Sequence, residues 1–397
     1  MVFQTFFTQC AIFKPVLYWL AAILICSSSC QNREESTKIQ DSIFTIQSDA
    51  KSVIQYAVGF DLVYYQKYKV LHIFQHYNET LDTLSYVLFE KGADIDQKFA
   101  GFRKIQIPVQ RIALLHSSYI SFFNLSETTS YIKAISEAKY IYDDVIYQSV
   151  QQGDLPEIGY GESLDKERLL ELKISAVVTV GFPNAPNKSQ HILEELGIPV
   201  IILSDWQETT LLGRAEWVKV IAALTGTEIL TSNKFDGIEK EYQRWKSLTS
   251  DLNERPKIIC NLPYKGAWYV PGGNSYMSNL FYDAGGDYLW SDDNGTGGIQ
   301  IDFETAYANG QLADFWINPD FAQNISEILD KDERLSDFQP IKKRKVFNSN
   351  KRINRNVAND YWESGLINPH LILADLIKTL HPELLPEHDL YYFQKLD

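Results

Sequence analysis

Aromatic side chains in loops are the residues of this sequence whose type and setting most suggest a site. They lie in stretches rich in glycine, proline and asparagine, and they are Trp206, Trp268, Tyr269, Tyr276, Trp290, Tyr361 and Trp362. A single loop aromatic usually packs against the nearest core, whereas several at the ends of strands favour a binding cleft. Because aromatic rings offer wide apolar faces, this pattern predicts a site for a bulky ligand.

The residue patterns of common enzyme classes are missing from the sequence. It contains no GxSxG elbow, P-loop or HExxH motif. Asp292 and Asp293 belong to a DDNGTGG stretch that a turn explains as well as a metal site does. His72 and His76 share one face of a predicted strand, but no further ligands accompany them. We therefore expect no catalytic residue, no metal site and no cofactor.

Length and charge narrow the classes of function further. The chain has 397 residues, enough for two domains, and 45% of them are hydrophobic, which is an ordinary globular composition. Its formal net charge is −14, which argues against a nucleic-acid groove as the main function. We expect a monomer that binds a small molecule.

The N-terminus resembles a bacterial lipoprotein signal peptide. Lys14 precedes an apolar run from Val16 to Ile25, which is too short to span a bilayer but typical of a signal-peptide core. Small residues then lead to Cys30, which we expect to be the lipidated first residue after removal of residues 1–29. The polar residues 30–42 are expected to form a tether from the membrane.

A long amphipathic helix is expected to connect two halves of the chain. Between Thr227 and Leu252, apolar residues recur in steps of three and four, which places them on one stripe of a helix. Gly226 can end the preceding helix, and Pro256 lies beyond the far end. On each side, short apolar strands alternate with amphipathic helices. We expect two Rossmann-like α/β lobes joined by one rigid helix; an ordinary long helix inside a single domain is the alternative.

The first lobe is expected at residues 43–226. Residues 43–104 contain strand-like runs that suggest an antiparallel β extension, namely IFTIQ, VIQYAV, YKVLHIFQHY and LSYVLFEKG. From residue 105 onwards, strands and helices alternate at the spacing of a parallel sheet covered by helices.

Ligands of such sheets bind beyond the carboxyl ends of the strands. The loops at 116–119, 181–187 and 204–210 are therefore the expected ligand side of the first lobe, with His116 and Ser118 among the candidate ligand-binding residues. The second lobe is expected at residues 253–397. It repeats the strand and helix alternation and closes with a helix that Pro369 begins.

Several segments resemble a known family. They are KERLLELKISAVVTVG, LEELGIPVIIL and LLGRAEWVKVIAALTGTE before the long helix, and GAWYVPGGNSYMSNLFYDAGGDYLWSDD and IDFETAYANGQLADFWIN after it. Together they resemble the helical-backbone substrate-binding proteins of ABC importers for cobalamin, ferric siderophores and haem, over roughly residues 105–380. The resemblance implies two α/β lobes on one rigid helix, a ligand in the cleft between them, and no enzymatic activity.

The resemblance also implies a surface glutamate in each lobe that pairs with arginines of the permease dimer, which works with its ATPase. KERLLELK places the first at Glu167, and IDFETAYANG places the second at Glu304. Each opens a predicted helix, where the helix dipole favours an anion. The sequence departs from the family at residues 116–119, where an acid is missing, and in the β extension.

These observations predict a solute-binding protein that is lipid-anchored in a bacterial cell envelope and feeds an ABC importer. We rank a ferric siderophore ahead of cobalamin as its ligand, with haem third. A negatively charged iron chelate would need cations in the cleft, and Lys265 and Arg355 are the clearest loop candidates. A surface capture lipoprotein without an importer is the alternative from another class.

Overall fold

The computed structural model describes residues 53–77, 80–181 and 188–397. The predicted signal peptide, Cys30, the tether and the IFTIQ run lie outside these residues. In the described part of the chain, no helix is both long and apolar enough to cross a membrane. Everything from residue 53 onwards belongs to one compact unit.

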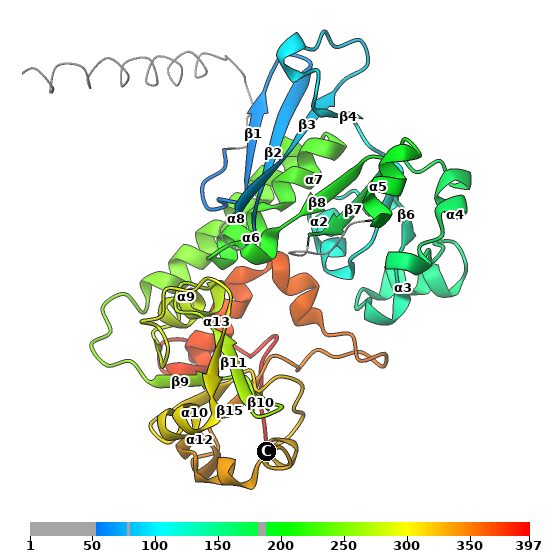
Figure 1. The fold of residues 1–397 in the computed structure, drawn as a ribbon. Helices are drawn as coiled ribbons and strands as arrows, with labels where there is room; N and C mark the ends of the chain where they lie inside the picture. The colour runs from blue at the N-terminus through cyan, green and yellow to red at the C-terminus, as the bar shows by residue number, and fades with distance from the viewer. Residues whose placement is uncertain (1–52, 78–79, 182–187) are drawn as a thin grey trace, which may run out of the picture. The chain divides into compact units, whose positions relative to one another are not determined.

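A four-stranded β extension precedes the first lobe (Figure 1). Its strands are β1 (Phe60–Tyr64), β2 (Tyr68–Tyr77), β3 (Thr80–Phe89) and β4 (Arg103–Gln106). The first three pair antiparallel in sequence order, as expected, and β4 pairs with β3 in parallel. The extension is attached to the lobe through hydrogen bonds such as that from the Tyr86 hydroxyl to the carbonyl of Val200, at 2.9 Å.

The VIQYAV segment is not a strand, which corrects our prediction. Its backbone instead lies against two buried carboxylates of the first lobe. The Glu216 carboxylate accepts hydrogen bonds from the N–H groups of residues 55–57, and the Glu208 carboxylate accepts those of Val58 and Gly59. Because these N–H groups already have partners, they cannot pair in a sheet ladder.

The N-terminal lobe is built on a parallel sheet. Its strands are β5 (Ile112–Leu114), β6 (Ile132–Ile135), β7 (Ala176–Val180) and β8 (Val200–Leu203), in the order β6-β5-β7-β8. The strands are nearly continuous apolar runs, as in sheets that are buried on both faces. Its helices are α2 (Ile120–Leu125), α3 (Asp144–Gln151), α4 (Lys166–Glu171), α5 (Lys188–Glu195), α6 (Leu211–Glu216) and α7 (Val218–Thr225).

The connecting helix α8 spans Glu228–Ser247, somewhat less than the predicted 227–252, because a turn replaces its last residues. Gly226, at φ 78°, ends α7 in the left-handed conformation that favours glycine. At its start, Lys234 of α8 donates to the carbonyl of Leu125 in the N-terminal lobe. Near its end, the Tyr242 hydroxyl donates to Asp283 of the C-terminal lobe at 2.7 Å. At 1.5 Å per residue, α8 is a rod of roughly 30 Å that is anchored in both lobes.

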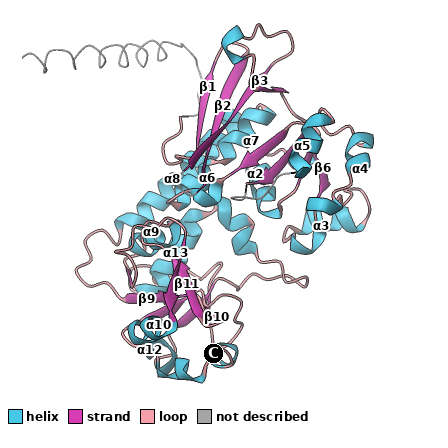
Figure 2. Ribbon diagram, viewed as in Figure 1, coloured by secondary structure: helices cyan, strands magenta, loops and turns pink. Residues whose placement is uncertain are grey.

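The C-terminal lobe has two sheets. The larger has the order β12-β9-β14-β15-β16, and it is parallel except for β16; its strands are Asp287–Tyr288, Lys257–Cys260, Phe315–Ile317, Val346–Asn348 and Gln394–Lys395. The smaller is antiparallel, β10-β11-β13, at Pro263–Tyr264, Ala267–Pro271 and Gly298–Asp302. Figure 2 labels three of these strands, β9 of the larger sheet and β10 and β11 of the smaller. The helices are α9 (Tyr276–Asp283), α10 (Phe303–Gly310), α11 (Ile325–Leu329), α12 (Gln339–Lys342) and α13 (Pro369–Leu380), and α13 packs against α8.

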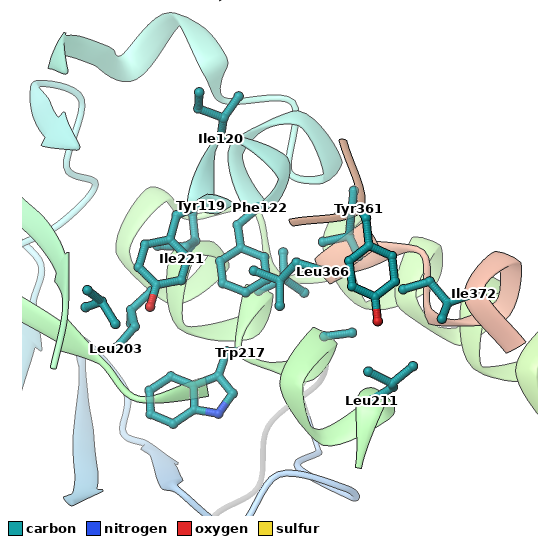
Figure 3. Close-up of a cluster of buried hydrophobic side chains, with 14 of the residues drawn as sticks. Tyr119, Ile120, Phe122, Leu203, Leu211, Trp217, Ile221, Tyr361, Leu366 and Ile372 are labelled. Atoms are coloured by element: carbon teal, nitrogen blue, oxygen red, sulfur yellow. The ribbon is translucent and has the colours of Figure 1, made fainter. Parts of the chain in front are cut away.

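One hydrophobic core runs through both lobes. Figure 3 shows part of it, where Phe122 of α2 and Leu211 of α6 lie beside Tyr361, Leu366 and Ile372 of the C-terminal lobe. The predicted fold class, two α/β lobes joined by one long helix with an N-terminal β extension, is therefore confirmed.

Candidate ligand-binding site

A buried ion pair lies where the two lobes meet. Asp205 lies two residues after the end of β8, and Arg214 lies on α6, whose N-cap is Thr210. The guanidinium of Arg214 is 3.0 Å from the carboxylate of Asp205 and stacks over the ring of Tyr276 on α9, 4.4 Å from its centroid. Because Tyr276 belongs to the C-terminal lobe, Arg214 joins the carboxyl-end loop of one lobe to a helix of the other.

Tyr119 and His116 complete the first lobe's side of this cluster. The Tyr119 hydroxyl donates to the second oxygen of Asp205 at 2.8 Å. Burial, and then the Asp205 carboxylate, raise the pKa of Tyr119 well above its ordinary value, so it stays a donor at neutral pH. Burial also lowers the pKa of His116, which favours a neutral ring. Its Nδ1 atom is buried without a hydrogen-bond partner among the described residues.

Tyr361 and Trp362 bring aromatic rings from the C-terminal lobe. Tyr361 is 4% exposed and Trp362 is 51% exposed. Their ring centroids are 4.8 Å apart, and the two rings are perpendicular. A gap of only about 10 Å³ remains between these residues and Arg214. That is barely the room of one water molecule, so a bulky ligand does not fit in this gap as the lobes stand in the structure.

Trp206 and Ser118 lie on the same carboxyl-end loops of the first lobe. The indole of Trp206 is half-buried and donates to the carbonyl of Gly181 at 2.7 Å. The hydroxyl of Ser121 donates to the carbonyl of Ser118, whose side chain remains partly exposed.

Trp268 does not fit the predicted aromatic wall. It is fully buried inside the C-terminal lobe, stacks on Phe338 and donates to the carbonyl of Cys260. The reason is the alternation of strand β11, which points Trp268 into the core and Tyr269 outwards. Trp290 is half-buried and packs edge-on against Tyr288 of the same lobe.

A separate cavity of about 950 Å³ opens in the C-terminal lobe. It lies just beyond the carboxyl ends of β9 and β14 and brings together Tyr269, Lys265 and Glu304. Tyr264 and Phe321 add exposed rings to its lining. The residues that line it differ from those around the inter-lobe gap. Arg355, the other predicted cation, instead lies over the ring of Tyr147 in the N-terminal lobe, 5.3 Å from its centroid.

Glu167 and Glu304 occupy matching local positions. Each is the second residue of its helix, α4 or α10, and each follows an aspartate N-cap, Asp165 or Asp302. Both side chains are exposed. They differ in their surroundings, because Glu304 is 3.1 Å from Arg334, which also pairs with an aspartate of its own loop.

Sequence reasoning missed the Asp205–Arg214 pair. The available signal was its setting, because Arg214 stands in a mostly apolar stretch, LLGRAEWVKVIAAL. A charge in such a stretch is buried, and a buried charge needs a partner. Among the described residues, no group of three or more His, Cys, Asp or Glu side chains could hold a metal ion.

Comparison with known proteins identifies the family. Residues 112–352, more than half of the chain, match the family model for periplasmic binding proteins. An uncharacterized lipoprotein of Methanocaldococcus jannaschii is 25% identical over 394 residues, which cover 92% of this chain and 90% of the relative.

Solved structures share the fold. A possible iron-binding periplasmic solute-binding protein of Staphylococcus epidermidis matches with a TM-score of 0.56 and 16% identity, over 69% of this chain and 99% of that chain. A periplasmic protein of Haemophilus influenzae with bound molybdate has the same TM-score and identity, over 72% of this chain and 90% of that chain. At this identity the likeness shows the fold alone. Together with the family match, it confirms the resemblance of the sequence to helical-backbone substrate-binding proteins: the chain belongs to the periplasmic binding protein family.

Proposed function

We propose that this chain is the lipid-anchored solute-binding protein of an ABC importer, and that it delivers a ferric siderophore or similar iron complex to a membrane permease. Cobalamin and haem are the alternative ligands. The observation that carries the proposal is the meeting of the carboxyl-end loops of two parallel sheets around Asp205 and Arg214, because ligands of such sheets bind at those ends. The curated relative described as a lipoprotein supports the proposed anchor at Cys30.

The proposed ligand contacts come from both lobes. They are His116, Ser118, Trp206, Arg214, Tyr276, Trp290, Tyr361 and Trp362. Tyr269, also predicted as a contact, and Lys265 line the separate cavity beside Glu304, outside the inter-lobe gap. The aromatic members suit a ligand with wide apolar faces. Arg214 is the cation placed to meet a negative group of a ferric chelate, provided that the chelate competes with Asp205 for it.

Tryptophan fluorescence of the chain from residue 31 can test the ligand. The protein is titrated with a panel of ferric siderophores, with cobalamin and with haem. We expect saturable binding of one class, because Trp206 and Trp362 lie at the proposed site and a bound ligand changes their surroundings. If no member of the panel binds to the folded protein, the proposed cargo is wrong.

Permease docking is proposed for Glu167 and Glu304. Both carboxylates are exposed near a helix N-terminus, and they belong to different lobes. Charges at the rim of an interface set the orientation and rate of association. Because one rigid helix joins the lobes, it fixes the distance between the two carboxylates, and each can then bind one of the two permease subunits.

A further inference from the structure

The loop after β15 crosses to the N-terminal lobe. Residues 349–368 leave the larger sheet of the C-terminal lobe at its carboxyl end and lead to α13. They contact the loop at 136–143, which follows the carboxyl end of β6 and ends at Asp143, the N-cap of α3. The two segments therefore lie on the ligand side of their sheets.

Three hydrogen bonds join these loops. The two oxygens of the Glu363 carboxylate accept from the N–H groups of Tyr142 and Asp143, both at 2.8 Å. The side-chain amide of Asn354 donates to the carbonyl of Ile141 at 2.9 Å. Each bond pairs a side chain of one lobe with the backbone of the other.

The segment that carries Glu363 and Asn354 is held by its own contacts. Asp360 pairs with Arg352 at 2.6 Å, and its N–H donates to the Arg352 carbonyl. The Asn354 side chain also accepts from the N–H groups of Asn356 and Ala358. The segment therefore presents both side chains in a fixed geometry, which reduces the entropy lost when the lobes meet.

Glu363 is 4% exposed, so the N–H groups of the other lobe take the place of water as partners of its carboxylate. A buried carboxylate without such donors is costly, and the two hydrogen bonds offset part of that cost. The adjoining inter-lobe gap is only about 10 Å³. A bulky ligand can enter there only if the lobes separate, and their separation would break these bonds.

We propose that Glu363 and Asn354 form a latch that, together with the apolar contacts between the lobes, holds the lobes together, and that ligand loading proceeds through release of this latch. The inference rests on the proposed function, because it assumes that the ligand binds between the lobes. A ligand that binds only the separated form must overcome the latch, so the latch lowers the apparent affinity and slows entry.

Distances between the lobes in the absence of ligand test the latch. Spin labels are placed by Leu170→Cys on α4 and Leu312→Cys beside α10, two exposed positions in different lobes of the chain from residue 31. Cys260 is fully buried and should stay unlabelled. Pulsed electron–electron double resonance then measures the distance distribution between the labels in the doubly labelled parent and in its Glu363→Gln and Asn354→Ala variants.

Glu363→Gln replaces one acceptor oxygen by an NH2 group, which faces a backbone N–H and cannot accept its hydrogen bond. At pH 9, where Glu363 is ionised, we expect the population at longer distance to rise about tenfold in this variant, as for the loss of a charge-assisted hydrogen bond. Asn354→Ala should raise it less, because it removes a neutral bond. Glu333→Gln, an exposed carboxylate of the same lobe, is the control and should leave the distribution unchanged.

Distributions that match the parent in both latch variants would overturn the proposal. If Glu363→Gln fails to fold, as judged by near-ultraviolet circular dichroism, Asn354→Ala alone decides. The measurement uses no ligand, so a negative result with the ligand panel would refute the proposed cargo and leave the test of the latch intact.

Discussion

At the scale of single residues, buried charge gathers in one short stretch, residues 205–219. Asp205 pairs with Arg214, and Glu216 pairs with Lys219 at 2.6 Å. Glu208 is bound by backbone N–H groups and by the indole of Trp217. Every one of these charges has a partner, so the loss of one partner exposes the full desolvation cost of the other.

Arg214→Met tests the inter-lobe ion pair. It leaves Asp205 buried with only the Tyr119 hydroxyl, so we expect the free energy of unfolding to fall by about 3–5 kcal/mol. Urea denaturation measures this change. Arg244→Met, which removes an exposed pair with Glu241, is the control and should cost less than about 1 kcal/mol. Equal small effects from both variants would show that the buried pair contributes little.

Trp268 and Trp362 should separate stability from binding. Trp268→Ala opens a cavity in a closed core, so we expect it to cost about 3–5 kcal/mol of stability while the folded fraction binds ligand normally. Trp362→Ala removes a half-exposed ring, so we expect little loss of stability but about 2 kcal/mol of binding energy. Denaturation measures the loss of stability of each variant, and ligand titration measures its loss of binding energy. A ligand-binding defect confined to Trp268→Ala would reverse our assignment.

The same two residues show what a sequence can reveal about a site. Both tryptophans stand near glycines in stretches that look like loops, so the sequence predicts the same exposed position for each. Only the pairing of β11 with β13 decides that Trp268 points into the core. His116 could be placed on the ligand side because the end of its strand was visible in the sequence. Arg214 could not be paired with Asp205, because the turn between them sets their distance.

At the scale of elements, Glu363 gives the contact between lobes a pH dependence. Burial is the main cause that raises its pKa from 4.5 to about 8; the N–H donors of Tyr142 and Asp143 lower it, and the carboxylates of Asp143 and Asp360 raise it. Arg352 is already paired with Asp360. The folded state therefore binds more protons than the unfolded state between these two pH values.

We expect the contribution of Glu363 to stability to be fully present below about pH 4.5 and to be lost as the pH rises to about 8. Denaturation midpoints from pH 5 to pH 9, for the parent and for Glu363→Gln, measure it. As the pH rises across this range, the parent should lose free energy of unfolding relative to Glu363→Gln, which does not titrate. A constant difference would mean that Glu363 does not titrate there.

Elements with strong periodicity were predictable, and elements defined by distant partners were not. The stripe of apolar residues in α8 is a local signal, and its helix is found where the pattern places it, apart from its frayed end. The VIQYAV run has the composition of a strand, but its backbone binds carboxylates that lie about 150 residues further along the chain. No local pattern carries that information.

At the scale of the whole molecule, the two exposed glutamates can be tested together. We expect Glu167→Ala/Glu304→Ala to bind ligand with unchanged affinity but to fail in supporting uptake or stimulating the transporter's ATPase, because rim charges guide docking. Uptake in cells and ATPase activity with the reconstituted transporter measure this. Glu254→Ala, another exposed carboxylate, is the control. Normal uptake by the folded double variant would refute the docking role, and lost ligand binding would place these residues on the wrong surface.

The division into two α/β lobes was predictable from the alternation of strands and helices on either side of α8. The contacts between the lobes were not, because they depend on side chains such as Tyr361 and Leu366 that fit against α2 and α6. Shape complementarity between segments more than 140 residues apart leaves no periodic trace in a sequence.

The core that runs through both lobes also decides how the protein comes apart. Phe122 and Leu211 on one side and Leu366 and Ile372 on the other bury each other, so neither half keeps its apolar surface covered alone. We expect a single cooperative heat-absorption peak in calorimetry. Halves produced separately, cut within the turn after α8, should aggregate unless they are co-expressed. Two resolved peaks would mean that each lobe is its own folding unit.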